Sequence, residues 1–157
     1  MKTHVQGIYP FEERLVSGQE YNVISLHPIW AWAVLYGGKD VENRSALTKQ
    51  RGRVLIHASA QKVGLGSEQD MRTELSFLTG IPRSELPVIF LRGAILGSVE
   101  IFDSVRAARS KWAVPSLHHW MLREPRVLSA PVLGVKGKLQ AFRWRFVDTK
   151  SGRVPRV

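Results

Sequence analysis

Alternating apolar and polar positions define the first regular elements of the chain. Residues 21–27 (YNVISLH) alternate and are rich in β-branched side chains, which predicts a strand. Pro28 follows, at a position where its fixed φ and missing N–H suit the first turn of a helix. The apolar run up to Tyr36 predicts a helix of about two turns, which Gly37 ends in the left-handed conformation.

A second strand and a second helix follow this pair. Residues 51–59 (RGRVLIHAS) give the clearest strand pattern, with one apolar face. The side chains of that face are Val54, Ile56 and Ala58. From about Ser67, an acid-rich start and a stop at Gly80 predict a helix.

The last third of the chain predicts mainly strands. Residues 94–105 form a long apolar strand pattern, residues 118–128 predict a short strand followed by a loop at Pro125, and residues 138–147 predict the last strand. Strands outnumber helices, and Gly and Pro interrupt them often. We therefore expect a mixed α+β domain built on a curled sheet or a small barrel.

Length and composition fit one globular domain. The chain has 157 residues, of which 44% are apolar, and this is enough to bury a core without cross-links. We expect a lead-in over residues 1–20, irregular or helical over a short stretch, and a folded domain over residues 21–148. Residues 149–157 are expected to form a basic tail.

Composition also excludes several classes of site. The absence of cysteine excludes disulfides and thiolate metal sites. The histidines show no ligand spacing, and the adjacent His118 and His119 would face opposite sides of a strand, so we expect no metal and no cofactor. No run approaches the roughly 18 apolar residues of a membrane span, and the N-terminus has no apolar signal core. A cytoplasmic protein without a membrane partner is expected.

Positive charge is the most informative bulk property. Lys and Arg number 23 against 13 Asp and Glu, which gives a net charge of +10. A net charge this positive in a small domain implies a polyanionic partner, most simply nucleic acid. The alternative is that the charge serves solubility alone.

The cations gather in two rows, which we name here. Lys49, Arg51 and Arg53 form the first basic row, because alternate residues of an extended segment point the same way. Arg143 and Arg145 form the second basic row, opposite an aromatic ladder of Phe142, Trp144 and Phe146. Neither row contains an acid, so we expect both to border a common groove. The alternative is an ordinary solvated strand face.

Three further side chains have an open role. Trp112 lies beside Lys111 before a turn, and it is either a base-stacking platform or a lid over the hydrophobic core. Trp30 and Trp32 are two residues apart on the first helix, so one helix face cannot bury both. His57 lies on the strand face opposite Val54, where it either lines a cleft or forms structural hydrogen bonds.

The segment YGGKDVENRS, residues 36–45, places three charges directly after the first helix. A Lys39 crowded by Arg44 and desolvated by a cleft wall would have a lowered pKa, and Glu42 could orient it or act as a general base. Equally, Lys39 and Arg44 could pair with Glu42 and fix the turn. On residues alone, this structural pairing is the safer interpretation.

The same segment spells G-x-K-x-x-E-x-R and resembles the signature of the ASCH domain, a family of the PUA-like superfamily. The likeness continues through ISLHPIWAWAVLYGGKDVENRSALTKQRGRVLIHAS, LRGAILGSVEIFDSV, SKWAVPSLHHWMLREPRVL and VKGKL, from about residue 23 to 147. Alone the signature would be weak, but four landmarks in the right order are specific. The chain departs from the family at two positions. The family commonly has Gln-Pro-Trp before the helix, whereas here the sequence is HPIW, with Pro28 one place early, and Ala46 stands where tryptophan is common after the Arg44–Ser45 pair.

This resemblance implies a small β-barrel of about five or six strands with surrounding helices, and a cleft between barrel and helices lined by the signature residues. It implies association with RNA or DNA. Some relatives are described as ribonucleases and others as amidohydrolases of acetylated cytidine. Lys39 matches the catalytic lysine of the amidohydrolase branch, which carries threonine where this chain has Glu42.

We therefore expect a nucleic-acid-binding module whose partner is RNA. The residues expected at this interface are Trp30, Lys39, Arg44, Ser45, Lys49, Arg51, Arg53, His57, Lys111 and Trp112. The alternative is a hydrolase in the same cleft, acting on single-stranded RNA or on a modified cytidine. Its catalytic residues would be Lys39, Glu42 and Arg44, with His57 as a further proton carrier. A plainer third alternative is a protein–protein adaptor.

Overall fold

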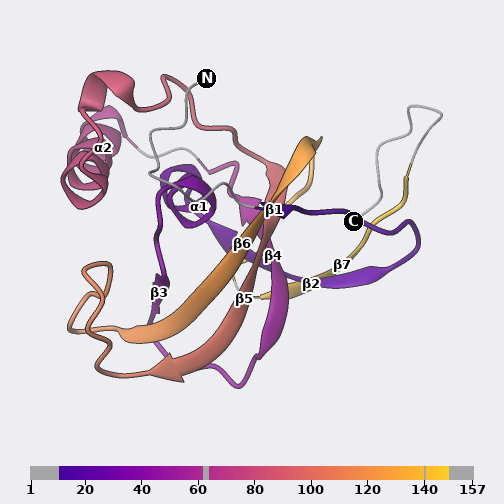
Figure 1. Ribbon diagram of the computed structural model, residues 1–157. Coiled ribbons are helices and arrows are strands. Elements are labelled where there is room, and N and C mark those ends of the chain that lie inside the picture. The colour runs from indigo at the N-terminus through magenta and orange to yellow at the C-terminus, as the bar shows by residue number, and fades with distance from the viewer. Residues whose placement is uncertain (1–10, 62–63, 140, 149–157) are drawn as a thin grey trace.

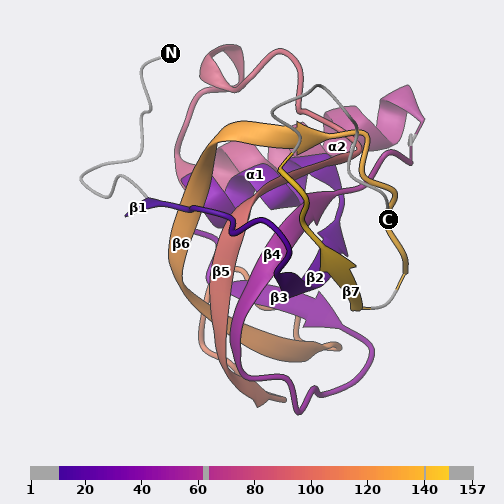
Figure 2. The ribbon, with the colours of Figure 1, turned by 90° about the vertical axis from the view of Figure 1, so that its right-hand side faces the viewer.

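The computed structural model describes residues 11–61, 64–139 and 141–148, and it contains two α-helices and one mixed sheet (Figures 1 and 2). The helices are α1 (Pro28–Tyr36) and α2 (Leu65–Thr79), and a 3-10 turn covers Arg83–Glu85. The strands are β1 (Phe11–Glu12), β2 (Glu20–Leu26), β3 (Val41–Arg44), β4 (Gly52–Ala58), β5 (Ala94–Val105), β6 (His118–Leu133) and β7 (Phe142–Arg145). The α+β class is confirmed.

The sheet is curled but open. Six of its seven strands run in the order β1-β6-β5-β4-β2-β7, and the seventh, β3, pairs with the first residues of β6, His118 to Met121. β2 pairs with β4 in parallel, across a connection that contains α1, and most other pairs are antiparallel. Within the described residues the edge strands β1 and β7 do not pair with each other, so the expected closed barrel of five or six strands is wrong.

Helix α1 lies between the sheet and α2 (Figure 1). One side of α1 packs with Ile24, Ile56 and Val99 of the sheet, and its other side packs with Leu75 of α2. A helix that is apolar all round is stable only when it is covered on both sides. The opposite face of the sheet carries a separate core, whose members are Val23, Leu55, Ile95, Leu128, Val135, Phe142 and Trp144.

Strand β6 shows where the strand predictions failed. It continues through Pro125 to Leu133, although a loop was expected there. Glu124 adopts a φ of 53°, and Glu124 and Pro125 together stand opposite the single residue Val99, which is a β-bulge. A bulge accommodates a proline, because the missing N–H is not required for pairing at that position.

Other boundaries differ less. Tyr36 ends α1 as expected, but Gly37 has a φ of −102°, and it is Gly38 that takes the left-handed conformation with a φ of 75°. β7 covers only Phe142–Arg145 of the predicted 138–147. Residues 11–12 of the lead-in form β1, while residues 1–10 and the tail at 149–157 lie outside the described residues. No helix in the described ranges combines the length and apolarity needed to cross a membrane.

Candidate functional site

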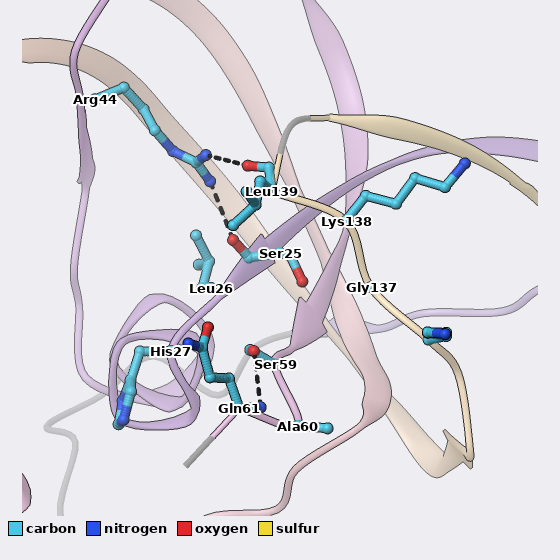
Figure 3. Close-up of a pocket in the computed structure, with 11 residues that line it drawn as sticks. Ser25, Leu26, His27, Arg44, Ser59, Ala60, Gln61, Gly137, Lys138 and Leu139 are labelled. Carbon is cyan, nitrogen blue, oxygen red and sulfur yellow. Dashed lines mark hydrogen bonds between the residues drawn. The ribbon is translucent and has the colours of Figure 1, made fainter. Parts of the chain in front are cut away.

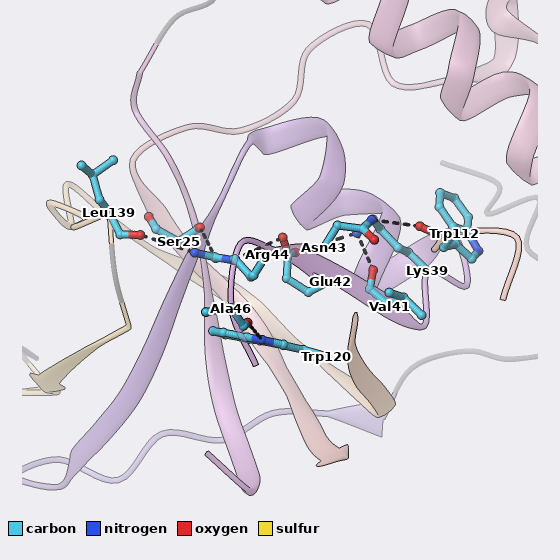
Figure 4. A network of polar contacts seen from close by, with 10 residues as sticks. All are labelled: Ser25, Lys39, Val41, Glu42, Asn43, Arg44, Ala46, Trp112, Trp120 and Leu139. Atoms are coloured by element: carbon cyan, nitrogen blue, oxygen red, sulfur yellow. Dashed lines mark hydrogen bonds and ion pairs between the residues drawn. The ribbon is translucent and has the colours of Figure 1, made fainter. Parts of the chain in front are cut away.

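Glu42 lies between two cations of the signature segment. Its Oε2 atom is 3.8 Å from Lys39 Nζ, and its Oε1 atom is 3.5 Å from Arg44 Nε (Figure 4). Strand β3 fixes the backbone of Glu42 and Arg44, because these two residues pair with Trp120 and His118 of β6. The predicted pairing of both cations with Glu42 is therefore present in the structure.

Lys39 is a buried ammonium group. Only 7% of the residue is exposed, its Nζ donates to Val41 O at 2.6 Å, and it lies 5.9 Å from the centre of the Trp30 ring. Desolvation lowers the pKa of Lys39 below its ordinary value of 10.5, although the Glu42 carboxylate acts in the opposite direction. The expected direction of this shift is confirmed, with burial as its main cause.

Arg44 is a cation fixed from several sides. Its guanidinium donates to Ser25 O at 3.1 Å and to Leu139 O at 3.4 Å, and it lies 5.2 Å from the Trp120 ring centre (Figure 4). Trp120 is held in turn by a hydrogen bond from its Nε1 to Ala46 O at 2.9 Å. The planar guanidinium can bind carbonyls and an aromatic face and still present further N–H donors.

Arg44 lines a pocket of about 510 Å³, here named the Arg44 pocket (Figure 3). Its lining residues are Ser25, Leu26, His27, Arg44, Ser59, Ala60, Gln61, Lys136, Gly137, Lys138 and Leu139. Three of them are Lys or Arg, and among these residues of the described chain none is acidic. The pocket therefore favours a negatively charged group.

Lys39 lines a separate pocket of about 250 Å³, here named the Lys39 pocket. Its lining residues are Trp30, Lys39, Glu42, Asn43, Glu74, Leu78, Trp112 and Val114. Two carboxylates face one ammonium group here, and two tryptophans supply apolar surface. This pocket therefore suits an uncharged or donor-rich group better than a phosphate.

His27 joins α1 to the Arg44 pocket. Its Nδ1 accepts a hydrogen bond from Ile29 N at 3.1 Å and so caps the helix, while its buried Nε2 has no partner among the described residues. Burial, followed by the charge of Arg92, lowers the pKa of His27. The neutral ring then carries its proton at Nε2.

The two basic rows do not border one groove. The strand registers place Arg53 on the face of Leu55, Tyr21 and Trp144, whereas Arg143 alternates with Trp144 and lies on the other face. The common-groove prediction is wrong, because β4 and β7 present their cations to opposite sides of the sheet.

The cations of these rows also have structural partners. Arg53 donates to Ser98 Oγ and to Glu124 O, each at 2.9 Å, and the second bond satisfies the carbonyl of the β6 bulge. Arg51 pairs with Asp103 at 3.6 Å, and Arg143 pairs with Glu20 at 3.0 Å. Lys49 and Arg51 are exposed and line neither described pocket.

Trp112 is a lid over the core and not an exposed platform. It is 5% exposed, packs with Ile29 and Leu75, and its carbonyl accepts a hydrogen bond from Asn43 Nδ2 at 2.9 Å. Part of the residue still lines the Lys39 pocket, as does the half-buried Trp30. Lys111 and Ser45 are exposed and line neither pocket.

His57 is a structural histidine. It is fully buried, its Nδ1 is hydrogen-bonded to Ser25 Oγ, and its Nε2 lies 2.7 Å from Val135 O. Both ring nitrogens are therefore occupied, so of the two alternatives for His57 the one with structural hydrogen bonds is confirmed, and its use as a further proton carrier in the cleft is wrong. Within the described ranges no three carboxylate or imidazole groups are grouped as metal ligands.

Sequence reasoning missed the far wall of the Arg44 pocket. Lys136 and Lys138 line it together with Gly137, and all three belong to the segment VKGKL. Two lysines around one glycine were a visible signal, since the glycine allows the backbone to pass close to other atoms. Ser25, Ser59 and Gln61 gave no comparable signal, because their place depends on the parallel pairing of β2 with β4.

Comparisons with known proteins point to one family. The ASCH domain family matches residues 24–114, which include α1, the signature segment and β4. The human protein "Activating signal cointegrator 1" is 31% identical over 94 residues, or 60% of this chain. That match spans only 16% of the human protein's length.

Proposed function

This chain belongs to the ASCH domain family, and on that premise we propose that it is a nucleic-acid-binding module whose natural ligand is RNA. We further propose that its open, curled sheet is a variant of the PUA-like barrel. The proposed cleft of this module comprises the Arg44 pocket and the Lys39 pocket, which are linked by the ion pair between Arg44 and Glu42. The cytoplasmic location stays a prediction, and fractionation of cells that express the protein would check it.

The unmixed positive lining of the Arg44 pocket carries this proposal. Arg44 is a fixed cation on one wall, and the exposed Lys136 and Lys138 line the other, where Lys138 Nζ lies 5.9 Å from the centre of the Phe142 ring. Its volume of about 510 Å³ falls within the range of about 300–1,000 Å³ typical of ligand pockets. A phosphate with its sugar fits this charge and size.

The Lys39 pocket supports a single-stranded ligand. Trp30 and Leu78 offer apolar surface, and Glu42 and Glu74 offer hydrogen-bond acceptors. These groups suit a base, but not a phosphate. A base reaches such a pocket only when it is unstacked, as in loops and single strands.

Salt-titrated binding tests the proposal. The protein would be titrated with single-stranded and duplex RNA and DNA of equal length. We expect the tightest binding to single-stranded RNA, and affinity that falls linearly on a log–log scale with salt, because bound phosphates release counterions. Binding to none of the four at low salt would contradict the proposal. That result would favour the adaptor alternative, for which the exposed Phe77, Val88 and Ile89 offer apolar surface.

A second candidate function is hydrolysis of an amide on a modified nucleoside. One observation favours it: a buried lysine with a lowered pKa lies 3.8 Å from a carboxylate in a pocket. Ribonuclease chemistry loses support, because His57 is buried and fully hydrogen-bonded. The test compares acetylcytidine turnover by wild type and Lys39→Ala. Activity in the wild type alone would support this function, and equal turnover would contradict it.

A further inference from the structure

The segment that carries Lys136 and Lys138, here named the lysine loop (residues 134–139), is fixed at its start. Val135 is 3% exposed, and its N–H donates to Gly93 O at 3.0 Å. Its carbonyl accepts the hydrogen bond from His57 Nε2 at 2.7 Å. The loop therefore begins on a buried polar anchor, although its lysines are exposed.

These contacts define the state of His57. A carbonyl only accepts, so Nε2 carries the ring proton, and Nδ1 accepts from the Ser25 hydroxyl. Burial lowers the pKa of His57 and maintains this neutral form. With 0% of the residue exposed, the ring has no room to move away from the loop.

Gly137 lies directly against this anchor. A Cβ atom at this position would lie 2.5 Å from Ser25 Oγ and 2.6 Å from His57 Nδ1, closer than packed atoms approach. Figure 3 shows the loop passing beside Ser25, with Leu139 turned toward Arg44 and Lys138 extending outward. Only glycine permits this approach, and any side chain would displace the loop.

We propose that Gly137 and His57 are positioning residues, which place Lys136 and Lys138 along the wall of the Arg44 pocket and hold the Leu139 carbonyl where it accepts a hydrogen bond from Arg44, and so complete the anion site. The ligand of this site is the RNA phosphate of the proposed function, on which the inference rests. Neither positioning residue touches the ligand through a charged group of its own. Both act through the lysine loop, so their loss should lower the salt dependence of RNA binding, which a purely structural role would leave unchanged.

The first test compares Gly137→Ala with Gly66→Ala. A Cβ atom at Gly66 in α2 would meet nothing within 4 Å, so this variant controls for the substitution itself. We expect Gly137→Ala to lower the affinity for single-stranded RNA and the salt slope as much as the double variant Lys136→Ala/Lys138→Ala does. Gly66→Ala should change neither quantity. An unchanged slope in folded Gly137→Ala would overturn the proposal.

A double-mutant cycle separates positioning from general destabilisation. Gly137→Ala is introduced into the Lys136→Ala/Lys138→Ala background, and RNA affinity is measured again. If Gly137 acts through the lysines, the added substitution causes less than a twofold further loss. The same loss in both backgrounds would show that Gly137 acts by another route and would overturn the proposal.

A second pair of variants applies if Gly137→Ala does not fold. His57→Gln retains an N–H donor for Val135 O, whereas His57→Leu does not. We expect His57→Gln to keep most of the wild-type salt slope and His57→Leu to lose it. Equal slopes in the two variants would overturn the proposal.

One readout does not require RNA. In wild type, the His57 Nε2 proton should exchange slowly with solvent in NMR spectra. In Gly137→Ala and in His57→Leu, the amide signals of position 137 and of Lys138 should shift, because the loop is displaced. Slow exchange without RNA binding would contradict the proposed function alone. A His57 ring proton that exchanges at the solvent rate in wild type would contradict the positioning role alone.

Discussion

The Arg44 pocket and the Lys39 pocket are linked by one ion pair, between Arg44 of the first and Glu42 of the second, yet they have opposite charge. The first is lined by three cations and, in the described chain, by no acid, while the second has two carboxylates and one buried ammonium group. The difference follows from what surrounds each cation of the signature segment: Lys136 and Lys138 line the pocket of Arg44, whereas Glu42 and Glu74 line the pocket of Lys39. A single short motif thus contributes one cation to each of two chemically distinct pockets.

The two cations also differ in how they are stabilised. Arg44 is held by two carbonyls and an aromatic ring and keeps its charge, because guanidinium groups do not deprotonate in proteins. Lys39 is desolvated, so its charge depends on Glu42 and on pH. Arg44 thus suits permanent phosphate binding, and Lys39 suits a role in which a proton moves.

Removing the shared carboxylate should give the largest effect. Glu42→Ala leaves two cations without their buried partner, and we expect the free energy of unfolding to fall by about 3 kcal/mol at pH 7. The exposed pair of Glu20 with Arg143 is the matched control, and Glu20→Ala should cost only about 0.5 kcal/mol. Urea denaturation measures both, and equal losses would contradict the role given to Glu42.

The pH dependence of this loss has a defined sign. The folded-state pKa of Lys39 lies below its ordinary value of 10.5. At pH values between this folded-state pKa and 10.5, the unfolded chain binds more protons than the folded chain, so the free energy of unfolding rises with pH. Without Glu42 this pKa falls further. Between the folded-state pKa of Lys39 in Glu42→Ala and that in wild type, only the variant gains stability as the pH rises, so the gap between the two proteins should shrink over this range and level off above the wild-type pKa. A gap that stays constant to pH 10 would show that Lys39 is not the group responsible.

Exchanging each cation separately sharpens the comparison. Arg44→Gln should weaken binding of single-stranded RNA about tenfold and lower the salt slope by about 0.7, the value for one phosphate contact. Lys39→Gln should leave the slope unchanged, because its pocket is not expected to hold phosphate. Fluorescence anisotropy over a range of salt concentrations measures both variants, and thermal unfolding confirms that each is folded. A larger slope change for Lys39→Gln would reverse the assignment of the pockets.

The smallest effect is expected in the Lys39 pocket. Trp30→Ala removes a half-buried ring from its wall, and loss of one stacked base should lower affinity by about 1 kcal/mol. The salt slope should not change, because stacking releases no counterions. If Trp30→Ala alters the slope and leaves low-salt affinity intact, the base is not bound in this pocket.

Local pattern predicted the helices and most strands, because their signals are local. Pro28 begins α1, Gly80 ends α2 with a φ of 73°, and β5 has the predicted bounds. The bulge at Pro125 could not be predicted, since it depends on how β6 pairs with β5. The closure of a barrel is likewise a property of edge strands that are far apart in sequence.

The site was predicted only where it is local. Lys39, Glu42 and Arg44 are neighbours in sequence, and their ion pairs follow from β3. The basic rows were assigned to one groove because alternation gives the face of a side chain relative to its own strand alone. Which face two strands share depends on register, and this placed Arg53 and Arg143 apart. Lys136 and Lys138 line the same pocket as Arg44 only through the tertiary contacts of the lysine loop, such as the hydrogen bond from Arg44 to Leu139 O.

The most direct test removes two cations from each of two places. Lys136→Ala/Lys138→Ala and Lys49→Ala/Arg51→Ala change the net charge equally, but only the first pair lines the Arg44 pocket. Salt-titrated binding of single-stranded RNA should show the slope reduced by about 1.4 in the first variant, the value for two phosphate contacts, and nearly unchanged in the second. Equal slopes in the two variants, or a larger loss in Lys49→Ala/Arg51→Ala, would contradict the assignment of phosphate to the Arg44 pocket.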